Sequence, residues 1–173
     1  MVESRLTTKV SLLAMFSVLA FLAAIIVKLT VSYGAIVYAI VLLIGVLTIR
    51  EPYGATAISL IAGLLYSFQS ALFLFILGAF LVRGLTIDVL FNIFGVYRRR
   101  DYRIWTVVLT MIISSFLAGV YQYLFLVLFL KKLVDFGAFI VSTIFLVALA
   151  SNALAGYLVP KYVMPRVEKA ISL

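Results

Sequence analysis

The sequence predicts an all-α integral membrane protein, a single bundle of six transmembrane helices with both termini in the cytoplasm. Its 173 residues are 66% hydrophobic and only 12% charged, whereas soluble domains carry about 45–50% apolar and about 25% charged residues. The charged residues also stand in clumps between long apolar runs. A water-soluble core of this size could not cover so much apolar surface. Residues 1–173 are therefore expected to form one transmembrane domain.

Five of the expected spans are bounded by charged or polar residues. A helix that crosses the hydrocarbon core needs about 20 apolar residues, and six such helices fit a chain of 173 residues. The bounded runs are Val10–Val27, Tyr33–Ile49, Tyr53–Phe68, Ile104–Leu130 and Phe136–Val159.

The remaining run, Ala71–Val96, is broken only by a few polar residues and allows two interpretations. It is either one long tilted helix, or a short hairpin segment followed by a helix from about Ala79. In the second case, counting about 20 residues back from the cytoplasmic end places Arg83 in the outer third of the membrane and Asp88 near its middle.

Basic residues predict the orientation, because cytoplasmic loops carry an excess of Lys and Arg. With a cytoplasmic N-terminus the outer set is small: Lys28, Lys131 and Lys132. The inner set is larger: Arg5, Lys9, Arg50, Arg98, Arg99, Arg100, Arg103, Lys161, Arg166 and Lys169. An even number of spans then returns the C-terminus to the cytoplasm. Topology and attraction to anionic lipid thus explain the net charge of +8, and no nucleic-acid partner is expected.

Arg83 and Asp88 are the strongest candidates for a binding site. Ionisable residues at membrane depth cost about 2.5–3.5 kcal/mol and usually line a cavity or pair with one another. These two are about 140° apart around a helix, which is poor alignment for an ion pair, whereas Asp88 and Asn92 share a face. Arg83 has an alternative, because its long side chain can extend to the outer surface. Asp88 needs a partner, a bound cation or a proton.

Polar residues on the last two predicted helices complete the candidate substrate site. Ser115, Ala118, Gly119 and Gln122 share one face of the fifth helix, and Tyr121 lies near its outer end. Asn152 lies on a small-residue face of the sixth helix. Together with Arg83, Asp88 and Asn92, the residues Tyr121, Gln122 and Asn152 are expected to bind substrate. The alternatives are interhelical hydrogen bonds for the amides and an interface anchor for the tyrosine.

The first helix carries a stripe of small residues within about 120° of one another. Its members are Ala14, Ser17, Ala20 and Ala24. Small side chains let a second helix approach closely in lipid. The stripe is therefore either internal packing or a docking surface for a separate membrane subunit.

The overall pattern resembles the substrate-binding (S) components of energy-coupling factor (ECF) transporters, the vitamin importers of bacteria and archaea. The segments that carry the resemblance are Thr8–Ser17, Pro52–Ala55, Val82–Leu85, Phe94–Arg99 and Asn152–Gly156. The resemblance implies a multi-pass protein of a prokaryotic plasma membrane, with a pocket open to the outside. It also implies partners, namely a transmembrane scaffold subunit and two cytoplasmic ATPases. The chain has no Gly-rich phosphate loop, so ATP chemistry must come from those partners.

The substrate depends on which charge faces the pocket. Asp88 would suit a cationic ring compound such as thiamine or a pyrimidine precursor, the leading expectation, whereas Arg83 would suit a carboxylate or phosphate. No cofactor or metal is expected, since the chain lacks Cys and His.

The alternatives from other classes are a lipid-modifying membrane enzyme and a stand-alone proton-coupled carrier that uses Asp88. The enzyme would need paired carboxylates or a nucleophile with a base, which the sequence does not place together.

Overall fold

A computed structural model describes residues 2–30, 34–70, 72–98, 103–131 and 135–171, and its regular elements are helices. In chain order they are α1 (Val2–Leu29), α2 (Ala35–Ile49), α3 (Gly54–Ser67), α4 (Phe73–Ile93), α5 (Ile104–Leu128), α6 (Phe136–Val141), α7 (Thr143–Leu158), the π-helical turn η1 (Val159–Val163) and α8 (Met164–Ile171). The predicted loop residues 99–102 and 132–134 lie outside the described ranges.

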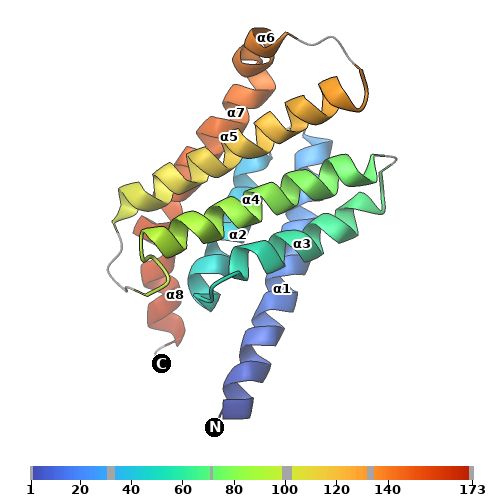
Figure 1. The fold of residues 1–173 in the computed structure, drawn as a ribbon. Helices are drawn as coiled ribbons and strands as arrows, with labels where there is room; N and C mark the ends of the chain where they lie inside the picture. The colour runs from blue at the N-terminus through green and yellow to red at the C-terminus, as the bar shows by residue number, and fades with distance from the viewer. Residues whose placement is uncertain (1, 31–33, 71, 99–102, 132–134, 172–173) are drawn as a thin grey trace.

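The helices form a bundle in which both chain ends lie at the same end and α6 lies at the other (Figure 1). Helix α3 packs on α4, α4 on α5, and α5 on α7. Helix α2 contacts α1, α3 and α7 and supplies much of the core, including the fully buried Leu42, Leu43 and Val46. A helix that is apolar on every side is stable only when it is surrounded, which explains the central place of α2.

Four helices of the described chain are long and apolar enough to cross a membrane, which confirms the membrane class. They are Thr7–Leu29, Phe73–Ile93, Ile104–Leu128 and Thr143–Ala170. Helices α2 and α3 are apolar but have only 15 and 14 residues. At 1.5 Å per residue they are about 22 and 21 Å long, less than the hydrocarbon core of about 30 Å. Among the described residues, four helices thus reach full length and two apolar helices are shorter, so the predicted number of six spans is not confirmed.

The ambiguous fourth run forms one continuous helix, α4, in agreement with the first of the two interpretations. Arg83 lies at the midpoint of its 21 residues, not in the outer third. Asp88 lies five residues before the last residue, Ile93, so it is about 7.5 Å from that end and not near the middle.

The last predicted span differs most from expectation. It is broken at Ser142, whose side-chain oxygen accepts a hydrogen bond from the Phe145 N–H at 3.4 Å and so begins α7. At its other end the chain does not stop at Val159 but continues through η1 into α8. Pro160 has no N–H to donate, and a wider π turn accommodates a residue that lacks this bond.

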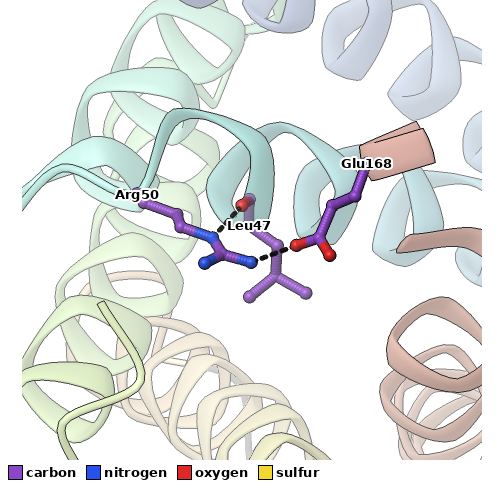
Figure 2. A network of polar contacts seen from close by, with 3 residues as sticks. All are labelled: Leu47, Arg50 and Glu168. Carbon is purple, nitrogen blue, oxygen red and sulfur yellow. Dashed lines mark hydrogen bonds and ion pairs between the residues drawn. The ribbon is translucent and has the colours of Figure 1, made fainter. Parts of the chain in front are cut away.

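Ion pairs tie the chain together at the end where the termini lie. Arg50 ends α2 in a left-handed conformation, with φ of 51°. Figure 2 shows its side chain, whose Nε donates to the Leu47 carbonyl at 3.0 Å and whose Nη2 pairs with Glu168 of α8. On the other side, Lys9 of α1 pairs with Glu51. These contacts join α1, the α2–α3 connection and α8.

The small-residue stripe of α1 faces the bundle. Ser17 and Ala20 are 0% exposed and Ala24 is 5% exposed, because α2 and α3 pack closely against this face. The Ser17 hydroxyl donates to the Leu13 carbonyl of its own helix at 2.7 Å. Only Ala14 of the stripe is exposed. The other three residues therefore belong to packing within this chain and not to a docking surface.

A glycine sets the distance between α3 and α4. A Cβ at Gly84 would lie 2.8 Å from the Thr56 Cα and 2.9 Å from the Ala55 carbonyl oxygen. Both neighbours are backbone atoms that cannot rotate away. Such close approach of backbones is a principal source of helix association in lipid.

We expect Gly84→Ala to destabilise the protein by about 1–3 kcal/mol, because the added methyl group forces the two backbones apart. The measurement is thermal unfolding in detergent. Gly54→Ala is the matched control, since the nearest atom to its Cβ would be 4.0 Å away. Equal melting temperatures for the two variants would show that the α3–α4 contact adjusts freely.

Candidate ligand-binding site

A cavity of about 350 Å³ lies within the bundle, near the lower end of the range of about 300–1,000 Å³ that is typical of small-molecule sites. Helices α1, α2, α3, α4, α5 and α7 all contribute to its wall. Its aromatic residues are Tyr38, Tyr66, Phe75, Phe80 and Phe145. Its small residues are Ala24, Ala35, Ala79, Ala118, Gly119 and Ala148, and its charged or hydrogen-bonding residues include Arg83, Ser115 and Gln122.

The cavity lies toward the end of the bundle that is remote from the two termini. Its wall includes Val27 near the end of α1, Ala35 at the beginning of α2 and Tyr66 near the end of α3. It also includes Phe75 in the first turn of α4 and Ile144 in the first turn of α7. Arg83, at the middle of α4, therefore marks its deep end.

The Arg83 side chain points into the bundle and not toward the surface. Its Nη2 lies 3.4 Å from the Ser115 hydroxyl oxygen of α5, within reach of a weak hydrogen bond. Its guanidinium carbon lies 5.2 Å from the centre of the Tyr38 ring of α2, a cation–π distance. Its Nε is buried and has no hydrogen-bond partner. The alternative in which Arg83 extends to the outer surface is therefore not the conformation of the chain.

Ser115 and Asn152 join α5 to α7 directly behind the cavity wall. The Asn152 side-chain Nδ2 donates to the Ser115 oxygen at 3.2 Å and to the Ala148 carbonyl at 2.7 Å. Because a carbonyl only accepts, the second bond fixes which end of the amide faces Ala148. Asn152 is fully buried and is not part of the cavity wall. It thus positions Ser115, as the interhelical alternative anticipated.

Of the other two candidates on α5, Gln122 lines the cavity and Tyr121 does not. The Tyr121 hydroxyl donates to the Leu74 carbonyl at 2.9 Å, which ties the outer part of α5 to the beginning of α4. A Cβ at Gly78 would overlap that hydroxyl, so the glycine makes room for the ring. Tyr121 belongs to the frame around the cavity.

Asp88 lies at the other end of the bundle, where it binds the beginning of α3. Its Oδ1 accepts from the Ala55 N–H at 3.1 Å, and its Oδ2 accepts from the Thr56 N–H at 2.7 Å and the Thr56 hydroxyl at 2.6 Å. The residue before α3, Tyr53, provides no side-chain cap. A carboxylate is favoured at this place, because helix N-termini carry unsatisfied N–H groups and a partial positive charge.

Tyr97 completes the surroundings of Asp88, since its hydroxyl donates to Oδ1. Burial first, and then the charge of Asp88, raise the pKa of Tyr97 well above its ordinary value. The phenol therefore stays protonated and remains a donor. All four donors around Asp88 come from the protein, which leaves the carboxylate no role at the cavity.

Asn92 is exposed although it follows Asp88 by one helical turn. That turn carries Asn92 about 6 Å further along α4, past the beginning of α3 that covers Asp88. The structure thus brings Arg83 and Gln122 to the cavity and places Asn152 behind it. It separates Asp88 and Asn92 from it.

Two residues that contact Arg83 in the cavity wall, Tyr38 and Ser115, were not among the predicted site residues. Tyr38 provides the only hydroxyl in the first half of α2. This hydroxyl could have marked Tyr38 as a candidate, but the surrounding residues of the helix are apolar and suggest a purely structural segment. Ser115 shares a helix face with Gln122, so it could have been included with that residue. The aromatic residues of the wall give no such signal, because aromatic side chains are also common on lipid-facing surfaces.

We expect Asp88→Asn to lower the stability by about 1–3 kcal/mol. An amide presents an NH₂ group to donors that require an acceptor. The measurement is thermal unfolding in detergent, with Asp135→Asn as control. Among the described residues, Asp135 accepts a single hydrogen bond, from the Ala138 N–H at 2.8 Å at the exposed beginning of α6. A loss no greater than that of the control would show that Asp88 does not hold α3.

No protein-family model and no curated protein matches this sequence. Among solved structures, the fold is similar to a crystal structure described as an S-component of an ECF transporter. The two chains are 19% identical, and the TM-score is 0.65 over 96% of this chain and 85% of that one. The resemblance seen in the sequence is therefore confirmed at the level of the fold.

Proposed function

We propose that this chain is the substrate-binding subunit of an ECF-type importer, which captures a vitamin or a related small molecule from outside the cell. The observation that carries this proposal is the cavity of about 350 Å³ between α1, α2, α3, α4, α5 and α7, within the fold of an S-component. Apolar and aromatic walls with a few convergent polar groups are typical of sites for small molecules. The volume equals that of about a dozen waters at roughly 30 Å³ each, which suits a small metabolite.

The expectation of thiamine or a pyrimidine precursor rested on Asp88 as the counter-charge. Asp88 is instead bound to the beginning of α3 and is not part of the cavity wall. We therefore retain a vitamin-sized ligand without a requirement that it be cationic. The same contacts argue against a proton-coupled carrier, since all four of Asp88's hydrogen bonds are internal.

The proposed partners are a transmembrane scaffold subunit and two cytoplasmic ATPases. The chain offers no phosphate-binding loop of its own, so ATP-driven uptake requires such subunits. The inward-facing residues of α1 are not available to a scaffold. Ala14 and its exposed neighbours Met15, Val18 and Leu22 form the outer side of that helix and are available.

We expect the purified protein to retain a small molecule in a one-to-one ratio, and to bind it again after it has been washed out. Native mass spectrometry of the detergent-solubilised protein measures both. Purification from the native host is expected to yield the ATPase subunits with it. Uptake by the isolated chain in liposomes, without ATPases, would contradict the proposal and favour a stand-alone carrier.

The proposed orientation places the termini in the cytoplasm and the cavity end outside. Among the described residues, the cavity end of the bundle carries Lys28 and Lys131. The opposite end carries Lys9, Arg50, Arg98, Arg103, Lys161, Arg166 and Lys169. This asymmetry is the one that the positive-inside rule associates with a cytoplasmic face.

Cysteine labelling tests the orientation, because the chain has no cysteine of its own. Gln69→Cys lies at the cavity end and Arg166→Cys at the end with the termini, and both positions are exposed. We expect a membrane-impermeant maleimide to label Gln69→Cys on intact cells, and Arg166→Cys only after permeabilisation. The reverse pattern would show that the cavity end faces the cytoplasm.

A further inference from the structure

Arg83 is a deeply placed cation for which the described part of the chain provides no carboxylate. Glu51 and Glu168 form ion pairs with basic residues at the end of the bundle with the termini. Asp88 binds the beginning of α3, and Asp135 binds the beginning of α6. Each carboxylate among the described side chains thus has another partner, and Arg83 is left without a counter-charge.

The surroundings of Arg83 compensate its charge only weakly. Among the described residues its partners are neutral side chains: Tyr38, and the Ser115 hydroxyl at 3.4 Å. An ionised group away from water is strongly unfavourable unless it is paired and fully hydrogen-bonded. Side chains of this kind at membrane depth mark ligand or ion pathways. The part of the cavity beside Arg83 is the place where a counter-charge would bind.

The groups beside Arg83 also provide hydrogen-bond donors and not acceptors. The Ser115 oxygen accepts from both Arg83 and Asn152, so its own hydroxyl hydrogen remains available. The Arg83 Nε–H is buried without a partner. The Arg83 guanidinium of α4 and the Ser115 hydroxyl of α5 therefore offer donors side by side at the cavity wall. Convergent donors around a cation match an oxyanion and repel a cationic group.

We infer that the ligand of this cavity carries an oxyanion group, a carboxylate or a phosphate, which binds the Arg83 guanidinium and the Ser115 hydroxyl. The aromatic walls formed by Tyr66 and Phe80 then hold an apolar or ring-shaped body above it. This inference rests on the proposed function and specifies the class of its substrate. The proposed ligand is therefore anionic, whereas the leading expectation from the sequence was a cationic ligand.

The test compares small molecules retained by the wild type with those retained by Arg83→Gln, Arg83→Lys and Arg166→Gln after identical expression. Arg166 is exposed on α8, so its variant makes the same substitution far from the cavity. Extraction and mass spectrometry identify the compound, and titration calorimetry with it measures affinity. We expect an acid, with affinity about ten- to hundredfold weaker in Arg83→Gln and unchanged in Arg166→Gln. Arg83→Lys keeps the charge but loses the planar fork, and should be intermediate.

A retained compound that is neutral or cationic would overturn the inference, and so would equal affinity in Arg83→Gln. Either result leaves the protein a binding subunit, so the proposed function would stand. A wild type that retains and rebinds nothing would count against the proposed function instead.

Thermal unfolding of the washed, ligand-free proteins tests the inference without any ligand. If the role of Arg83 is to bind an anion, the substitution Arg83→Gln removes an uncompensated charge. The variant protein should then unfold at the melting temperature of the wild type or above it. If Arg83 holds the bundle together, Arg83→Gln melts lower than both the wild type and Arg166→Gln. That second outcome would overturn the inference.

Discussion

The first N–H groups of a helix that begins inside a protein have no water to bind, and the Asp88 carboxylate meets this constraint for α3. It accepts hydrogen bonds from the N–H groups of Ala55 and Thr56 and from the Thr56 hydroxyl. The short α3 can therefore begin within the bundle. Gly84, one turn earlier on α4, lets the two backbones touch. The position of α3 against α4 depends on these two residues.

The same contact determines what Arg83 can do. Arg83 and Asp88 are on one helix but about 140° apart, so the carboxylate faces α3 while the guanidinium faces α2 and α5. The two opposite charges do not neutralise each other. One satisfies a helix terminus permanently, and the other is left at the deep end of a cavity. The structural charge of Asp88 and the proposed binding charge of Arg83 are thus separated by the geometry of a single helix.

The fold is shared with an S-component structure at only 19% identity. Helix association in lipid depends on small residues at the crossings, and most other apolar residues are interchangeable there. The crossings of this chain fit that pattern, with Gly84 against α3 and Gly156 against α5, where an added Cβ would lie 2.9 Å from the Val108 Cα. Polar groups inside such a bundle can therefore differ between chains without loss of the fold.

The sequence by itself determined the membrane class and most helix boundaries. Tyr33–Ile49 and Ile104–Leu130, for example, differ by only two residues from α2 and α5. Hydrophobicity is a local property, so a run of apolar residues and the charges that end it can be read without knowledge of the neighbours. The break between α6 and α7 at Ser142 was not predicted, because the hydrophobicity of a run does not show where a serine ends one helix and begins the next.

Only the tertiary structure decided which polar side chains share a site. Asp88 binds Thr56, which is 32 positions away, and Arg83 contacts Ser115 at the same separation. Asn152 reaches Ser115 across 37 positions. In the sequence, Asp88 and Arg83 are equivalent intramembrane charges, and the small residues of α1 suit an internal or an external partner equally. Their roles depend on the helix opposite, since a polar or small side chain in lipid is defined by what packs against it.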